Sequence, residues 1–171
     1  VTHDLEESLA IGDRLAVLFN GKLHQLDSVS NVFSYPVTPE VASFVGVENI
    51  IPGVVQSRSE DLVQIKANGA IIEAVSDLNP GAHVYICLRP EDISLCNPQE
   101  GAAPSSARNR VHCQITQVVN QGPLSRVQMQ SGFPLSALVT RPSAREMGLV
   151  TGKDVIAVFK SSAVHLIRSN Q

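Results

Sequence analysis

The feature that most constrains the fold is an ungapped internal repeat in the second half of the chain. The stretch PGAHVYICLRPEDISL, residues 80–95, aligns with TGKDVIAVFKSSAVHL, residues 151–166, at an offset of 71 residues. In both copies a glycine turn precedes an alternating apolar run, a cation (Arg89 or Lys160) follows the run, and a short apolar segment ends the copy. A repeated β-unit of this kind predicts two similar β-lobes.

Short β-rich runs separated by turn residues precede each copy of the repeat. They are GVVQS, LVQIKA and AIIEAV before the first copy, and VHCQITQVV, LSRVQMQSG and PLSALVT before the second. This pattern predicts a mainly β fold of barrel type, with residues 52–96 as a first lobe, 97–105 as a polar linker and 106–171 as a second lobe. The stretch SAREMGL predicts one helical turn that ends at Gly148.

Residues 1–51 have a different pattern, which predicts a small α+β segment. Asp4–Gly12 has apolar residues near helical spacing. Asn20-Gly21 stands between two apolar runs, which is typical of a two-residue hairpin turn. SVSNVFSYP and TPEVASFVG each predict a short helix with a side-chain cap at its start.

Composition excludes several classes of function. The net charge of −3 gives no basic field for a generic nucleic-acid binder, so we expect no nucleic-acid partner. No window reaches the ~18 consecutive apolar residues of a membrane span. The chain has 3 cysteines without a CxxC pair and scattered histidines without metal spacing, so we expect no metal site and a reducing, cytoplasmic compartment.

The first 51 residues resemble the end of an ABC-transporter ATPase domain. The resemblance rests on Thr2-His3-Asp4 with the acidic helix after it, on Gly12-Asp13-Arg14, and on NGKLHQLDS, VFSYP and VASFVGVENII. It implies that His3 is the catalytic switch-loop histidine of a parent ATPase that uses ATP and Mg²⁺. Because the sequence has no G-x-x-x-x-G-K-[ST] phosphate loop, we expect no catalysis by this chain alone.

The β-lobes resemble the accessory domains of such ATPases. LRPEDISL in the first lobe is similar to a signature of the TOBE domain, an OB-like fold, and the second lobe resembles the Mop domain, which binds molybdate or tungstate. The resemblance implies a site built from the SARN stretch and two further segments: Ser106, Ala107, Arg108, Asn109, Thr140, Ser143, Lys160 and Ser161. It also implies a homodimer, because Mop-type sites lie between subunits.

The chemistry of these residues independently suits an oxyanion. Molybdate is a tetrahedral dianion that accepts hydrogen bonds only, and the segments supply hydroxyl groups, one guanidinium from Arg108 and one ammonium from Lys160. The first lobe has RPED where the second has KSSA, and it lacks a SARN stretch. Its two carboxylates would repel a dianion, so only the second lobe is predicted to bind one.

Three functions remain open. The first is a regulatory domain of a molybdate or tungstate importer ATPase, which dimerises, binds oxyanion for feedback control and lies at the inner membrane beside permease subunits. The second is a purely structural TOBE dimerisation domain of an importer for sulfate, iron or an organic solute, in which Arg108 pairs with a glutamate. The third, an oligonucleotide or sugar binder, is disfavoured by an aromatic content of 4%.

Overall fold

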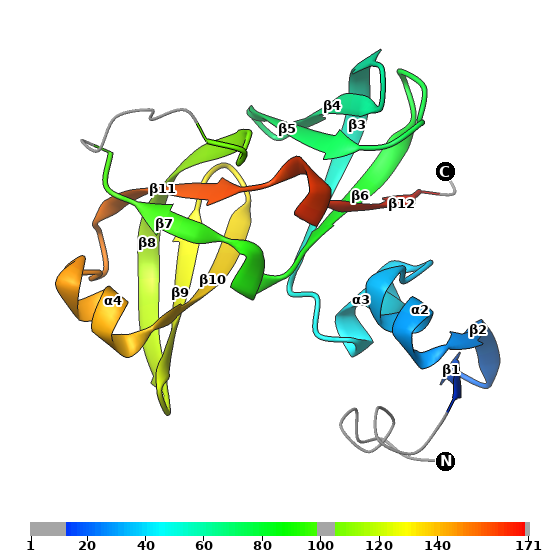
Figure 1. Ribbon diagram of the computed structural model, residues 1–171, viewed down its shortest axis with the longest axis horizontal. Coiled ribbons are helices and arrows are strands. Elements are labelled where there is room, and N and C mark those ends of the chain that lie inside the picture. Colours follow the sequence, from blue (N-terminus) through cyan, green and yellow to red (C-terminus); the bar gives the residue numbers. More distant parts are fainter. Residues whose placement is uncertain (1–12, 99–104, 170–171) are drawn as a thin grey trace.

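The computed structural model describes residues 13–98 and 105–169 of the chain. It contains a small α+β segment at its N-terminal end and two five-stranded antiparallel sheets (Figure 1). The predicted mainly β fold is confirmed. The predicted helix Asp4–Gly12 and His3 lie outside the described residues.

The N-terminal segment begins with the predicted hairpin. β1 (Arg14–Phe19) pairs with β2 (Lys22–Ser28) in antiparallel fashion. The two turn residues, Asn20 and Gly21, have φ values of 50° and 72°. Left-handed conformation at both positions is what a type I′ turn requires, and Asn-Gly meets that requirement at low cost.

Two short helices follow the hairpin, as predicted. They are α2 (Val29–Ser34) and α3 (Pro39–Phe44). The Ser28 side chain accepts a hydrogen bond from an amide in the first turn of α2, and the Thr38 side chain does the same for α3. Such caps satisfy amides that have no partner within the helix, which is why these six-residue helices begin where they do.

The two sheets have matching strand orders. The first has the order β12-β6-β3-β4-β5 and the second β7-β11-β8-β9-β10. The bounds are β3 Asn49–Ser59, β4 Leu62–Ala67, β5 Ala70–Val75, β6 His83–Leu88, β7 Ser94–Cys96, β8 Asn109–Gln121, β9 Leu124–Gln130, β10 Pro134–Thr140, α4 Arg141–Glu146, β11 Asp154–Phe159 and β12 His165–Arg168.

The last strand of each lobe lies in the sheet of the other lobe. A 3₁₀ turn, η1 (Pro90–Asp92), leads from β6 into β7, which pairs with β11. Its counterpart η2 (Ser161–Ala163) leads from β11 into β12, which pairs with β6. Figure 1 shows the green β7 beside the orange β11, and the red β12 beside β6. The sheets therefore do not follow the segment boundaries expected from the sequence, because each repeat donates its end to its neighbour.

One hydrophobic core spans both lobes, and a second cluster attaches the N-terminal segment. The main core joins buried residues of the first sheet, such as Ile65, with those of the second, such as Phe159. The second cluster joins Val32 and Val41 of the helices to Cys87 on β6 and Ile167 on β12. The N-terminal segment thus packs on the strands that the exchange brings together. None of the described helices is long and apolar enough to cross a membrane.

Candidate functional site

Two of the predicted site segments meet at the end of the β8–β11 ladder. Asn109, the first residue of β8, pairs with Phe159, the last residue of β11. Arg108 directly precedes Asn109 and Lys160 directly follows Phe159, so the two cations flank the same end of this ladder. Both cations are exposed, whereas Asn109 and Phe159 are buried. The two positively charged residues are about 50 residues apart in the sequence.

The equivalent position in the first lobe carries opposite charges. Asn49 pairs with Leu88, and Glu48 and Arg89 flank that end of the ladder. Glu48 forms an ion pair with Arg126, and Arg89 Nη1 lies 4.0 Å from Glu91 Oε1, so both charges have a partner. In the second lobe Arg108 pairs with Glu73, whereas the Lys160 side chain has no ion pair among the described residues.

Lys160 and Ser161 both have unused hydrogen-bonding capacity. Within residues 13–98 and 105–169, the side chain of Lys160 makes no hydrogen bond or ion pair, and the residue is exposed. Ser161 is 5% exposed, and its Oγ atom has no hydrogen-bond partner in the described part of the chain. A buried hydroxyl normally finds a partner, so this atom is a candidate donor to a ligand.

Arg108 differs from the free guanidinium expected of a ligand residue. Its Nε atom forms an ion pair with Glu73 Oε2, and its Nη2 atom lies 3.4 Å from Glu73 Oε1. Glu73 lies on β5 of the first lobe, so no local sequence pattern indicates this partner. Arg108 holds the pKa of the Glu73 carboxyl below its usual value, mainly through this hydrogen bond. The alternative in which Arg108 pairs with a glutamate is thus what the structure contains.

Asn109 binds backbone rather than facing solvent. It is 2% exposed, its Oδ1 atom accepts a hydrogen bond from the Glu73 amide at 2.7 Å, and its Nδ2 atom donates to the Glu73 carbonyl at 2.9 Å. Asn49 makes the same two contacts with Ser136 on β10, at 2.7 and 2.9 Å. Each asparagine caps the edge strand of the opposite lobe, so Asn109 has a structural role within the chain.

The remaining predicted residues are dispersed. Ser106 is exposed and Ala107 is half-buried, just before β8. Thr140 caps α4: its Oγ1 atom accepts from the Ser143 amide at 3.2 Å and lies 2.8 Å from Ser143 Oγ. Thr140 is exposed and Ser143 is half-buried.

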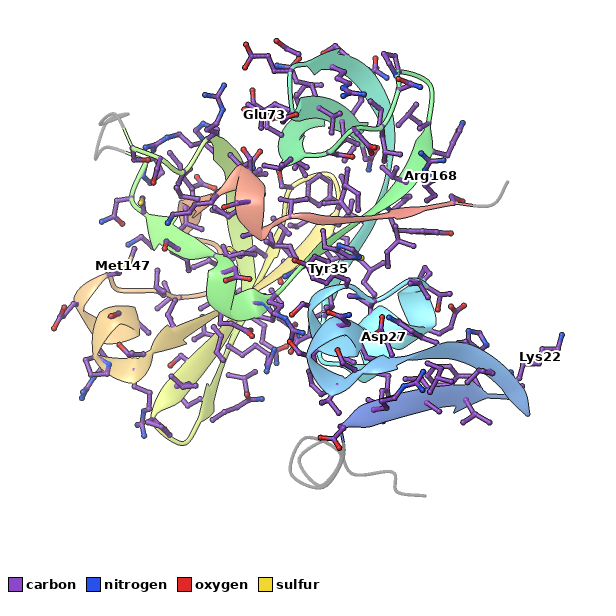
Figure 2. All side chains as sticks on the ribbon, turned by 45° about the vertical axis from the view of Figure 1, so that its right-hand side comes forward. Lys22, Asp27, Tyr35, Glu73, Met147 and Arg168 are labelled. Carbon is purple, nitrogen blue, oxygen red and sulfur yellow. The ribbon has the colours of Figure 1, made fainter. Side chains whose placement is uncertain are left out.

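The register separates Thr140 and Ser143 from the other site residues. Thr140 pairs with Leu124, which pairs with Gln121 at the far end of β8 from Asn109. At about 3.3 Å per residue, the length of β8 between these two levels is on the order of 40 Å. Figure 2 likewise shows Met147, just after α4, well away from Glu73. Within one chain, the fold does not bring Thr140 to Lys160.

Arg89 has a structural role that the sequence analysis did not predict. Its Nη1 atom donates to the Val45 carbonyl at 3.0 Å and its Nη2 atom to the Phe33 carbonyl at 2.9 Å. These carbonyls belong to the C-terminal ends of α3 and α2, where cations are favourable. The one signal for this role is the alignment of Arg89 with Lys160, which marks a cation after each repeated strand.

A cleft of about 750 Å³ lies between the N-terminal segment and the two 3₁₀ turns. Arg89 and Lys160 line it together with Asp92, Tyr35 and His165. Burial raises the pKa of the Asp92 carboxyl, and neighbouring Glu91 raises it further. The His165 Nε2 atom lies 2.8 Å from the carbonyl oxygen of Pro36, so β12 also holds the N-terminal segment. Figure 2 shows Tyr35 at this junction.

The described residues contain no group of three or more His, Cys, Asp or Glu side chains that is arranged to hold a metal ion. The cysteines Cys87, Cys96 and Cys113 are unpaired thiols in this structure. Burial raises the pKa of the Cys87 thiol to about 12. The donors that the site offers are hydroxyl groups and cations, which suit an anionic ligand rather than a metal.

The sequence and the fold of the chain are similar to those of several known proteins. The TOBE domain model matches residues 105–166. The molybdate/tungstate import ATP-binding protein WtpC of Pyrococcus abyssi is 38% identical over 96% of this chain and 45% of its own length, and that of Pyrococcus horikoshii is 37% identical over 97% and 46%. The putrescine transport ATP-binding protein PotG of Escherichia coli is 28% identical over 91% of this chain and 42% of its own length.

The chain thus spans about half the length of the curated relatives that it matches. Among solved structures, the cytoplasmic molybdate-binding protein ModG, with molybdate bound, has a TM-score of 0.60 and 22% sequence identity. That match covers 70% of this chain and 95% of ModG. At this level of identity the likeness establishes a shared fold, in agreement with the OB-like lobes predicted from the sequence.

Proposed function

The chain belongs to the ATP-binding proteins of ABC importers that carry a TOBE domain, and from this premise we propose that its second lobe binds molybdate or tungstate to regulate such an importer. The parent protein would hydrolyse ATP with Mg²⁺, use His3 in its switch loop, and act at the cytoplasmic face of the inner membrane beside permease subunits. This chain would supply the regulatory part and not the phosphate loop.

The juxtaposition of Arg108 and Lys160 carries the proposal. Two exposed cations flank one end of the β8–β11 ladder, and the hydroxyl of Ser161, next to Lys160, is buried and has no partner in the described chain. A dianion would pair with the cations and would accept a hydrogen bond from the hydroxyl. Thr140 and Ser143 would complete the shell from a second copy of the chain, because one chain cannot bring them to Lys160.

Feedback requires that the oxyanion bind the two states of the transporter with different affinities. In this chain, η2 leads directly from Lys160 into β12, whose Ile167 packs on the N-terminal segment. A ligand bound to Lys160 and Ser161 would therefore affect the position of β12, the strand that packs on the ATPase-derived segment. We infer that occupancy of the site favours the arrangement in which two ATPase domains are apart.

Titration calorimetry tests the binding. The chain is titrated with molybdate, tungstate, sulfate and phosphate at fixed ionic strength, and its mass is followed by light scattering. We expect heat with molybdate and tungstate in a dimer, and none with the Lys160→Ala variant. Lys66→Ala, which removes an exposed cation on β4 of the first lobe, is the matched control and should bind as the unmodified chain does. An absence of heat with all four anions in a verified dimer would contradict the proposal.

A second function is favoured by one observation, the ion pair between Arg108 and Glu73. In a purely structural dimerisation domain this pair would join the lobes and no anion would enter. The two functions differ in their response to ligand. A structural domain would form the same dimer with and without oxyanion, and its melting temperature would not depend on molybdate concentration.

A further inference from the structure

Glu73 places a carboxylate on Arg108, one of the cations of the candidate anion site, and a carboxylate repels an anionic ligand. We propose that Glu73 sets the affinity threshold of the oxyanion site: its carboxylate occupies Arg108 in the free protein, and a dianion must displace it to bind. This inference rests on the proposed function, and it assigns to the first lobe a residue that controls binding in the second.

The contacts of Glu73 fit the role of an internal substitute for the ligand. Both carboxylate oxygens face the Arg108 guanidinium, which is the geometry in which arginine binds an oxyanion. The Glu73 side chain is 19% exposed and the Arg108 side chain is 56% exposed. The guanidinium is therefore accessible from solvent, so an anion can reach it and compete with the carboxylate.

The backbone of Glu73 is fixed, whereas its side chain is held by polar contacts alone. Asn109 brackets its amide and carbonyl groups, at 2.7 and 2.9 Å. Besides Arg108, its carboxylate has one further hydrogen-bond partner among the described residues, Gln64 Nε2 at 3.4 Å. The carboxylate can thus leave Arg108 by side-chain rotation while β5 stays in place.

The first lobe shows that the carboxylate is not needed for the fold. Asn49 makes hydrogen bonds to the backbone amide and carbonyl of Ser136, as Asn109 does to those of Glu73. Ser136 is therefore the structural equivalent of Glu73. The equivalent of Arg108 is Glu48, which forms its own ion pair with Arg126 on β9. The same backbone contact therefore accepts a serine, and a glutamate paired with Arg108 occurs only at the second lobe's candidate site within the described residues.

Displacement predicts that removal of the carboxylate strengthens binding. Glu73→Gln keeps the shape of the side chain, removes one negative charge and leaves Arg108 available. The Coulomb repulsion between a carboxylate and a dianion several ångströms away predicts a gain in molybdate affinity on the order of tenfold. Glu73→Ser, which copies the residue at the equivalent position 136, is a second variant that the bracket should tolerate. Glu48→Gln changes the net charge equally at the other pair and is the matched control.

The experiment measures molybdate affinity by calorimetry for the unmodified chain and these three variants, after thermal melts have verified their folding. We expect tighter binding for Glu73→Gln and Glu73→Ser and no change for Glu48→Gln. In an Arg108→Ala background, the gain from Glu73→Gln should shrink, because the two residues act on one another.

Two results would overturn the inference while the proposed function stands. The first is an unmodified chain that binds molybdate with an affinity that neither Glu73 variant raises. The second is weaker binding by both variants, which would make Glu73 a supporting residue of the site. An absence of molybdate binding by every protein in the series would instead refute the proposed function, and this inference with it.

Discussion

At the scale of single residues, two asparagines determine how the lobes meet. Asn49 and Asn109 are buried at the first positions of β3 and β8, and each makes two hydrogen bonds to an edge strand of the other lobe. A side-chain amide suits this position because it offers a donor and an acceptor with the spacing of a peptide group. The sequence shows both residues, in VENII and SARN, but not the strand that each one caps.

Asn109→Ala should destabilise the fold strongly. The change removes two hydrogen bonds and leaves the amide and carbonyl of Glu73 unpaired at a partly buried edge. The expected loss in the free energy of unfolding is about 2–4 kcal/mol, measured by urea denaturation. A loss below about 0.5 kcal/mol, typical of a neutral surface substitution, would contradict the assigned role.

The ion pair of Glu73 predicts a pH dependence of stability. Because Arg108 lowers the pKa of the folded-state carboxyl below its ordinary value of 4.5, the pair contributes stability above pH 4.5. This contribution is lost as the pH falls below 4.5 through the folded-state value. We expect the difference in melting temperature between the unmodified chain and Glu73→Gln to shrink from pH 7 to pH 3. A difference that grows on acidification would show the opposite linkage.

At the scale of elements, local patterns in the sequence correctly predicted the hairpin at Asn20-Gly21, both capped helices and the strands that make up the two sheets. Turn chemistry and alternation act over a few residues, so one sequence suffices to read them. The exchange of β7 and β12 rests on pairing with β11 and β6, which are distant from them in the sequence. Local patterns do not encode such long-range pairing, so the sequence analysis did not predict the exchange.

The candidate site was likewise predicted in part from the sequence. The convergence of SARN with Lys160-Ser161 follows from the pairing of β8 with β11, and the resemblance had grouped the same two segments. The carboxylate of Glu73 belongs to the other lobe and has no signature near Arg108. The N-terminal segment, from residue 13 onward, packs on β6 and β12. The hydrophobic pattern of the segment alone does not determine this packing.

Arg89 should hold the helices of the N-terminal segment in place. Arg89→Ala removes the two hydrogen bonds to the C-terminal carbonyls of α2 and α3, at an expected cost of about 2 kcal/mol. Hydrogen exchange should accelerate at the amides of residues 29–47 and remain unchanged in β8 and β9. Lys160→Ala, the equivalent cation in the second lobe, is the control and should leave this exchange unaffected. Equal acceleration in both variants would contradict the assignment.

At the scale of the whole molecule, the exchange of strands joins two lobes into one folding unit. Each sheet contains a strand from the other repeat, and one core connects them. The two lobes therefore share one core around the candidate site, with the N-terminal segment on one side. Such an arrangement suits a module that must pass a local change from one lobe to the other.

Cooperative unfolding of the two lobes follows from this arrangement. Val155→Ala, a truncation of a buried β11 side chain that is 1% exposed, should lower the free energy of opening by about 2 kcal/mol. Native-state hydrogen exchange should show the same decrease for protected amides of the first sheet and of the second. A decrease confined to the second sheet would mean that the lobes unfold separately.

The most direct test of the central claim is the location of the bound anion. Crystals of the chain grown with molybdate, measured at the molybdenum absorption edge, should show one anomalous peak per chain within hydrogen-bonding distance of Lys160 Nζ and Ser161 Oγ. Thr140 or Ser143 of a second copy should face the same peak. A peak at another place on the molecule, or a dimer crystal soaked to saturation that shows none, would contradict the account.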